Sequence, residues 1–410
     1  MTTAVRTFTL SGVDAVLLTT EVDLLRRLPS VAIIGLPSLS VRETADRVRS
    51  ALTAGGYDFP RQRVVVSVAP ADVRKDGTGF DLPIAAAILI AAGRLWIPAD
   101  YVLAGELSLG GEVRSVRGAV AFAVQHPDLV LVCARSMAEA TVRAGGRAIA
   151  IDSVAALAEP MVELVAPART TREHHSLDFR DVRGMDEVVD ALVEAAATRR
   201  TVVLRGPPGC GKTMLAARMP GLLPALTRAE ALDVLRVHDA AGLSSPDTDP
   251  DTVGRPFRAP HHSASPAGLL GGATLRPGEV TLAHLGVLFL DEFAEFPRHA
   301  REVLRGPMED KQIVLARASG RTVMPADFWL VVATNPCPCG NHGHPTRVCV
   351  CSPATRERYD AQWVGDQLLR DALVIDLPVP TSDAILTARP GRTTAELRDR
   401  SRADTACPAK

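Results

Sequence analysis

Thr201-Val-Val-Leu-Arg-Gly-Pro-Pro-Gly-Cys-Gly-Lys-Thr213 is the stretch that decides the fold. Its β-branched run predicts a buried strand, which enters a glycine-rich turn fitting G-x-x-x-x-G-K-[ST] and then a helix. Backbone N–H groups of such a turn surround an anion, and the helix N-terminus adds partial positive charge. The sequence therefore predicts a bound nucleoside triphosphate, with Lys212 at the outer phosphates and the Thr213 hydroxyl on Mg²⁺. The predicted nucleotide-binding residues are Gly206, Pro207, Pro208, Gly209, Cys210, Gly211, Lys212 and Thr213.

Length and composition indicate an ordinary globular chain. At 410 residues, a prior of about 150 residues per domain suggests two or three domains. Hydrophobic residues make up 47% and charged residues 23%, which is enough apolar material for a core. The net charge of −1 argues against a strongly basic nucleic-acid coat, but leaves room for a local basic surface. Only four of the 46 basic residues are lysines, so a lysine inside the phosphate loop is more telling than usual.

The lack of a targeting signal and the number of cysteines favour a cytoplasmic, soluble protein without a membrane partner. The N-terminus lacks the basic start and apolar core of a secretory signal. The longest apolar run, residues 82–92, is too short to span a bilayer. Seven cysteines, an odd number with four of them clustered, fit a reducing compartment better than a disulfide framework.

A second apolar run, residues 286–290, ends in two acidic residues about 80 residues after the phosphate loop. Continuous apolar character predicts a strand buried on both faces, as in the centre of a parallel sheet. At its end Asp291 is predicted to hold Mg²⁺ and Glu292 to polarise the attacking water. Adjacent acids are common on surfaces, but this position favours a catalytic role.

Four cysteines form a C-x-C…C-x-C pattern within residues 337–351. Four thiolates in a reducing compartment suit a closed tetrahedral zinc site. Bound metal would contribute about 10–16 kcal/mol to ordering a loop with little apolar content. Reduced free thiols or a redox pair remain alternatives, as do His342 and His344 as ligands. The predicted zinc ligands are Cys337, Cys339, Cys349 and Cys351.

Several short sequence motifs resemble those of the YifB/ComM family of magnesium-chelatase-like AAA+ ATPases. They are Gly-Leu-Pro at 35–37, Ala-Pro-Ala-Asp-Val-Arg-Lys-Asp-Gly-Thr-Gly-Phe-Asp-Leu-Pro at 69–83, and Gly-Glu-Leu-Ser-Leu at 105–109. Further matching words lie within residues 255–280, and the resemblance covers about residues 8–360. It implies an α/β protein with a Lon-protease-like (ribosomal S5 domain 2-like) domain at 1–165. A linker at 166–176 and a P-loop AAA+ ATPase domain at 177–380 follow.

The resemblance also locates the positions of a Lon-type Ser–Lys dyad. Gly79 falls at the serine position and Val120 near the lysine position, so neither nucleophile nor base is present. We therefore expect a domain without peptidase activity. Lys75 is expected to be a loop lysine paired with Asp72 or Asp76.

Comparison with AAA+ ATPases adds further candidate residues. Asn335, after the apolar run 328–334, matches the sensor 1 position that orients water between the two acids and the γ-phosphate. Arg370 lies in an altered version of the motif that supplies an arginine finger to a neighbouring subunit, and the resemblance implies a homo-hexameric ring for the complete protein. The segment 182–184 (Val182, Arg183, Gly184) holds candidate adenine contacts, with simple helix packing as the alternative.

The resemblance implies DNA as a partner. In related motors a hairpin before sensor 1, here residues 312–322, lines a pore, which makes Lys311, Arg317 and Arg321 candidate phosphate contacts. Solvated surface charge explains them about as well. His261 and His262 are expected to be structural loop residues.

The C-terminal part departs from the family pattern. Residues 381–410 are expected to be a polar tail, arginine-rich and disordered over 390–410, with the helical lid missing. The favoured function is an ATP-driven ring motor on DNA, of the branch-migration or helicase type, with poor turnover and weak assembly expected of this chain because the lid is missing. The alternative is a magnesium-chelatase-type subunit whose nucleotide cycle drives a protein partner, and ATPase stimulation by branched DNA separates the two.

Overall fold

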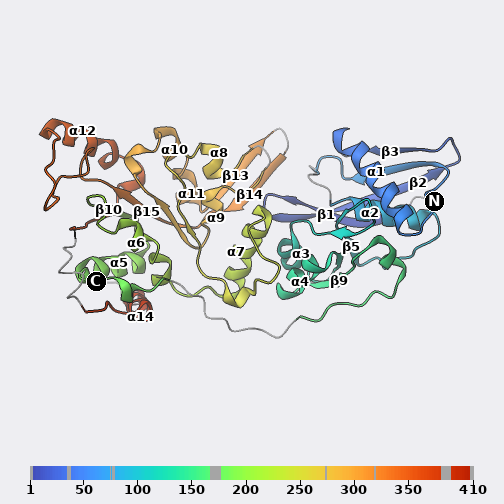
Figure 1. Cartoon of the computed structure of the whole chain (residues 1–410), viewed down its shortest axis with the longest axis horizontal. Coiled ribbons are helices and arrows are strands. Elements are labelled where there is room, and N and C mark those ends of the chain that lie inside the picture. Colours follow the sequence, from blue (N-terminus) through green and yellow to red (C-terminus); the bar gives the residue numbers. More distant parts are fainter. Residues whose placement is uncertain are drawn as a thin grey trace. The chain divides into compact units, whose positions relative to one another are not determined.

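The computed structural model describes residues 3–34, 38–73, 75, 79–166, 177–272, 275–317, 320–379 and 389–406 (Figure 1). The chain divides into two compact units. The first comprises residues 1–171 together with 235–252 and 316–322. The second comprises residues 172–234, 253–315 and 323–410. The first unit thus includes two short segments that lie, in the sequence, within the predicted ATPase domain.

A mixed seven-stranded sheet, in the order β3-β4-β2-β1-β5-β8-β9, forms the centre of the first unit. β2 pairs antiparallel with β1 and β4, and the remaining pairs are parallel. The strands are β1 (Thr3–Ser11), β2 (Asp14–Leu25), β3 (Ser30–Ile34), β4 (Arg63–Ala69), β5 (Tyr101–Leu103), β8 (Val130–Cys133) and β9 (Arg147–Ala150). A separate two-stranded ribbon pairs β6 (Glu106–Leu107) with β7 (Val113–Arg114).

Helices complete the core of this unit. They are α1 (Ser38–Ala54), α2 (Asp81–Ala91), α3 (Ala119–Gln125) and α4 (Arg135–Arg143), followed by the short helix η1 (Val154–Ala158). α2 is apolar on every side and nearly all of it is buried, as expected of a helix inside a core. At its start the buried carboxylate of Asp81 accepts hydrogen bonds from Arg47 at 2.7 and 3.1 Å.

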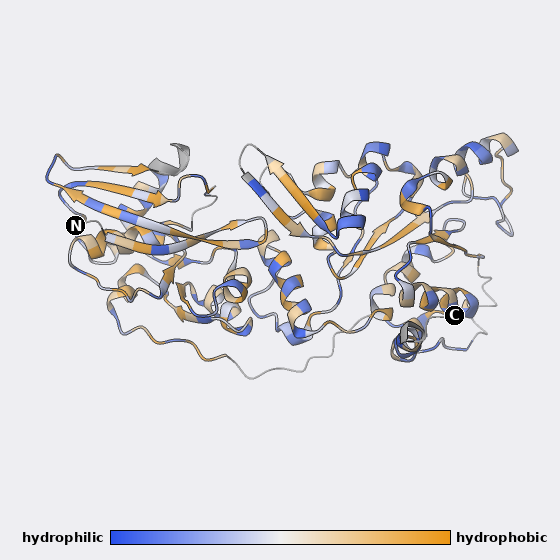
Figure 2. Cartoon of the chain, turned by 180° about the vertical axis from the view of Figure 1, so that it is seen from behind, coloured by the Kyte–Doolittle hydropathy of each residue, from blue (hydrophilic) through white to orange (hydrophobic). Residues whose placement is uncertain are grey.

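The second unit contains an all-parallel five-stranded sheet in the order β11-β12-β15-β10-β16. Its strands are β11 (Phe257–Arg258), β12 (Val287–Leu290), β15 (Trp329–Thr334), β10 (Val202–Arg205) and β16 (Leu373–Asp376). β12 and β15 are buried along their whole length, because both faces of a parallel sheet are covered. Figure 2 shows these strands as largely hydrophobic, and the predicted α/β fold class is confirmed.

The remaining helices between residues 179 and 369 are mostly short, apart from α5, α7 and α12. They are η2 (Phe179–Asp181), α5 (Asp186–Thr198), α6 (Lys212–Ala216), η3 (Met219–Leu222), α7 (Arg228–Ala241), η4 (Pro250–Thr252), α8 (Pro266–Leu270), α9 (Glu279–Leu282), η5 (Phe293–Glu295), α10 (Arg298–Glu302), α11 (Arg305–Asp310), α12 (Pro353–Val364) and η6 (Gln367–Leu369). A hairpin of β13 (Gln312–Arg317) and β14 (Gly320–Pro325) precedes β15.

The expectation of a disordered C-terminal tail is wrong for part of it. Residues 394–406 form helix α14 (Thr394–Ala406), which contacts α5 and η3 and buries Leu397. Asp178 accepts hydrogen bonds from the backbone and hydroxyl of Thr394, and Arg392 donates to Asp190 at 2.7 Å. Composition predicted disorder because the helix is polar, whereas in the structure it packs through the buried Leu397 and through the hydrogen bonds and ion pair at its N-terminal end.

No helix among the described residues combines the length and the hydrophobicity that a bilayer crossing requires.

Candidate functional site

The phosphate loop joins β10 to α6 at the carboxyl edge of the parallel sheet, where ligands bind in folds of this kind. Gly209 and Gly211 have φ of +83° and +97°, which glycine adopts without strain. The predicted strand, loop and helix are therefore all present. The remaining candidate residues can be located relative to this loop.

Lys212 is 9% exposed, and its ammonium group lies inside the loop. Nζ donates to the carbonyl oxygens of Gly206 at 2.6 Å and Pro207 at 3.1 Å. It also donates to Oδ1 of Asn335 at 3.1 Å. Because β10 and β15 are neighbours in the sheet, the predicted phosphate-loop lysine and sensor residue meet at one edge.

The predicted magnesium ligands also lie together. The Thr213 hydroxyl donates to Oδ2 of Asp291 at 3.1 Å, and Oδ1 of Asp291 accepts from the backbone N–H of Glu292 at 2.9 Å. A hydroxyl and a carboxylate are hard oxygen ligands of the kind that Mg²⁺ prefers. The two oxygen donors, one after the end of β12 and one at the start of α6, therefore fit Mg²⁺.

Glu292 has φ of +51° and lies directly after Asp291, and its carboxylate contacts a residue that sequence reasoning undervalued. Oε2 of Glu292 is 3.2 Å from Nδ1 of His262, and the rings of His261 and His262 are 4.1 Å apart. β11 pairs in parallel with β12, so the chain after β11 reaches the same edge of the sheet. The contact between His262 and Glu292 could not be predicted, because it depends on the order of the strands in the sheet, which the spacing of residues does not show.

Arg370 is not brought to this site within one chain. It is exposed and precedes β16, whose first residue pairs with the first residue of β10. Beside it, the carbonyl of Asp371 accepts from Arg200, which precedes β10. Arg370 therefore lies at the amino edge of the sheet, and the length of β10, about 13 Å, separates this edge from the phosphate loop.

The candidate adenine contacts lie between η2 and α5. Val182 is buried, whereas Arg183 is exposed. The chain packs closely here, since a Cβ on Gly391 would lie 2.4 Å from the carbonyl oxygen of Val182. Packing thus accounts for Val182, and an adenine contact stays a prediction.

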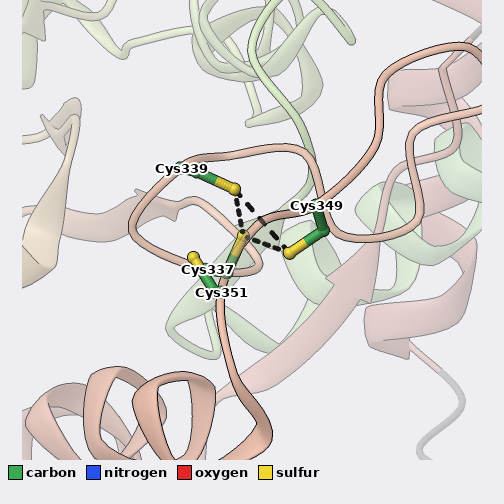
Figure 3. Close-up of side chains that lie close together, drawn as sticks. All are labelled: Cys337, Cys339, Cys349 and Cys351. Atoms are coloured by element: carbon green, nitrogen blue, oxygen red, sulfur yellow. Dashed lines mark hydrogen bonds between the residues drawn. The ribbon is translucent and has the colours of Figure 1, made fainter.

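The four cysteines converge in the loop after β15 (Figure 3). Sγ of Cys337 is 3.4 Å from that of Cys339 and 3.7 Å from that of Cys349. All four sulfur atoms lie within 4.8 Å of one another. Zinc–sulfur bonds of about 2.3 Å in a tetrahedron place sulfurs about 3.8 Å apart, so this set fits zinc. The separations exceed a disulfide bond of about 2.05 Å.

The histidines considered as alternative ligands make other contacts. Nδ1 of His342 is 2.7 Å from the guanidinium of Arg356. Nδ1 of His344 accepts from the backbone N–H groups of Thr346 and Arg347.

Backbone N–H groups of Asn341 and Val350 hydrogen bond to Cys339 and lower the pKa of its thiol to about 6. A thiolate at this position is the form that binds metal.

The dyad positions of the first unit carry no catalytic groups. Gly79 has no side chain, and Val120 is buried, with its backbone N–H donating to Asp239 at 3.0 Å. Lys75 is also buried, and Nζ donates to the Pro70 carbonyl oxygen at 2.5 Å. Burial lowers the pKa of Lys75 and the charge of Asp72 opposes this. Asp76, the other expected partner, lies outside the described residues.

The candidate DNA contacts of the hairpin differ in their surroundings. Lys311 lies 3.6 Å from the Asp327 carboxylate, so its charge is partly neutralised. Arg321 is exposed on β14. The side chain of Arg317 lies outside the described residues.

The phosphate loop, the Asp291 carboxylate and the Asn335 amide meet at one sheet edge, which is the arrangement of an AAA+ nucleotide-dependent ATPase. Comparison with protein families matches residues 178–385 to magnesium chelatase, subunit ChlI, and residues 20–129 to a second model, subunit ChlI of Mg-chelatase. The chain belongs to the YifB/ComM family of magnesium-chelatase-like proteins.

Relatives match along nearly the whole chain. An uncharacterized protein of Mycobacterium tuberculosis, Rv2897c, is 40% identical over 403 residues, which cover 95% of this chain and 79% of that protein. YifB of Escherichia coli is 38% identical, with 95% and 78% covered. The competence protein ComM of Haemophilus influenzae is 37% identical, with 95% and 79% covered.

Proposed function

We propose that this protein is an ATP-driven motor that acts on DNA. The observation that carries the ATPase part is the meeting of Lys212, Thr213, Asp291, Glu292 and Asn335 at one sheet edge. Phosphoryl transfer depends mostly on positioning and charge compensation, which side chains from three strand ends can supply together.

Each side chain has a distinct task in this proposal. Lys212 balances charge on the outer phosphates, and Asn335 holds the ammonium group in position. Glu292 polarises the attacking water, and His262 orients the Glu292 carboxylate. Thr213 and Asp291 would hold Mg²⁺, which supplies positive charge at the phosphates.

The DNA part of the proposal rests on the hairpin and on the family. Arg321 and Val323 are exposed on β14, as are Val314 and Ala316 on β13. A cationic side chain on such a face contacts backbone phosphates without reading sequence, which makes binding sensitive to salt. ComM, one of the relatives, is described as a competence protein.

Steady-state ATPase assays with branched, linear duplex and no DNA test this function. We expect stimulation by branched DNA, falling as salt rises, and loss of most of it in Arg321→Ala. Arg298→Ala is the control, because Arg298 is another exposed arginine and lies on α10, outside the hairpin. Lys311→Ala should have a smaller effect than Arg321→Ala, since Asp327 already neutralises Lys311 in part.

The alternative is a subunit that drives a protein partner, as the match to a magnesium chelatase subunit allows. It makes the opposite prediction for the same assay. Turnover that no DNA changes, but that rises with a protein fraction, would favour it over the DNA motor.

We further propose a homo-hexameric ring in which Arg370 contacts the nucleotide of a neighbouring copy. The location of Arg370 at the far sheet edge supports action between chains. Sizing with a non-hydrolysable ATP analogue tests this: a hexamer supports the ring, and a protein that stays monomeric contradicts it. An Arg370→Ala protein with unchanged turnover would contradict the role of Arg370.

A further inference from the structure

The four-cysteine loop packs directly against the phosphate loop. Gly340 is buried and has φ of +74°. A Cβ at this position would lie 2.8 Å from Cδ and 2.9 Å from Cγ of Pro208, closer than real Cβ contacts allow. The backbone of the cysteine loop therefore lies against the proline ring of the phosphate loop, with no room for even a methyl group.

The residues that lead into the cysteine loop also contact the phosphate loop. The carbonyl of Thr334, the last residue of β15, accepts from the N–H of Gly206 at 3.2 Å. Asn335 follows and contacts Lys212, and two residues later comes Cys337, which is fully buried. The segment 334–340 thus contacts the phosphate loop at its first residue, at its lysine and at Pro208.

Apolar burial does little to hold this loop in shape. All of residues 337–351 are described, and only Cys337 and Gly340 among them are buried. Val348 and Val350, on either side of Cys349, are each 84% exposed. Because the loop lacks a core of its own, metal bound by the sulfur cluster would contribute much of its order, beside the hydrogen bonds that His342 and His344 make.

We propose that the cysteine loop is a positioning element for the phosphate loop, and that metal binding by its cysteines raises nucleotide affinity. Metal fixes the loop, the loop holds Gly340 against Pro208, and Pro208 holds the phosphate loop in its binding conformation. Coupling between two binding sites is reciprocal, so nucleotide must strengthen metal binding by the same factor. This inference rests on the nucleotide binding proposed for the same site.

Two glycines of the loop allow a matched test of the contact. Gly343 has φ of +79°, close to that of Gly340, but a Cβ there would meet nothing within 4 Å. Gly340→Ala and Gly343→Ala therefore share the backbone strain and differ in the clash with Pro208. In titrations with a fluorescent ADP analogue, we expect Gly340→Ala to weaken binding about fivefold or more, within the usual range of site coupling. Gly343→Ala should stay within about twofold of wild type, and both should keep their zinc.

A competition experiment on the wild type tests the reciprocity. Zinc-loaded protein is titrated with a zinc-selective chelator, with and without ADP and excess Mg²⁺, and the nucleotide affinity of the zinc-free protein is measured separately. We expect ADP to raise the chelator concentration needed for zinc removal by the factor that zinc adds to ADP affinity.

The outcomes separate this inference from the proposed ATPase function. Equal ADP affinity with and without zinc, or equal losses in the two alanine variants, would overturn the positioning role while leaving nucleotide binding intact. A zinc-loaded wild-type protein that binds no nucleotide would instead overturn the ATPase assignment.

Discussion

Replacing Arg301 should destabilise the second compact unit, here called the ATPase unit, much more than replacing Arg298 three residues earlier. Both arginines are on α10, and each lies 2.8 Å from a carboxylate, Asp366 for Arg301 and Glu302 for Arg298. They differ in exposure. The side chains of the first pair are 11% and 17% exposed, those of the second 86% and 61%.

The magnitude follows from this difference in burial. At 2.8 Å the attraction between unit charges is about 6 kcal/mol at an effective dielectric constant of 20, and about 1.5 kcal/mol in water. Desolvation offsets most of the larger value, but deleting one partner of a buried pair leaves the other charge uncompensated. Arg301 also donates to the carbonyl of Gln362 at 2.8 Å. We expect Arg301→Met to lower the free energy of unfolding by about 2–4 kcal/mol, and Arg298→Met by less than about 0.5 kcal/mol.

Urea unfolding followed by tryptophan fluorescence measures both effects. Trp329 and Trp363 are buried in the ATPase unit, whereas Trp96 is 78% exposed and changes little on unfolding. A double-mutant cycle with Asp366→Asn should give a coupling energy of about 1–2 kcal/mol. Equal costs for Arg301→Met and Arg298→Met, or additive effects in the cycle, would refute the dependence on burial.

Three further expectations concern the nucleotide site, the metal and the C-terminal helix. Lys212→Ala should abolish binding of a fluorescent nucleotide, while Glu292→Gln should keep binding and lose turnover; equal binding losses would contradict this division of roles. Purified protein should contain about one zinc per chain by elemental analysis, and Cys349→Ser should lower both the metal content and the melting temperature. A metal-free wild type with unchanged melting would favour free thiols. Hydrogen bonding to Arg392 lowers the pKa of Asp190, so its stabilising effect is present at neutral pH and disappears as the pH falls through that lowered pKa. Asp190→Asn should therefore cost up to about 1 kcal/mol at pH 7 and nothing in strong acid, as measured by chemical denaturation.

Site residues that directly follow a buried strand could be predicted from the sequence, because the apolar strand and the residues at its end are visible in the local pattern. The phosphate loop, Asp291 and Asn335 each follow a continuous apolar strand, and parallel strands bring their carboxyl ends to one edge. The cysteine cluster was predictable for the same reason, since its four ligands lie within one short loop.

Contacts that depend on long-range packing could not be predicted. His262 reaches Glu292 only because β11 pairs with β12. Gly340 meets Pro208 through the juxtaposition of two loops that are far apart in the sequence. Helix α14 docks through Leu397 and paired charges, a signal too sparse for composition to separate from a disordered tail.

The position of Arg370 gives the parallel sheet two chemically different edges. The phosphate loop is at one edge and Arg370 at the other, so one chain cannot offer both to the same nucleotide. An assembly in which Arg370 reaches a nucleotide must place the amino edge of one sheet against the carboxyl edge of the next. Such head-to-tail contacts are vectorial: every copy gives to one neighbour and receives from the other. They close into a ring or continue as a filament, whereas a two-fold symmetric dimer could meet the requirement only by making the contact twice, with Arg370 of each copy at the nucleotide of the other.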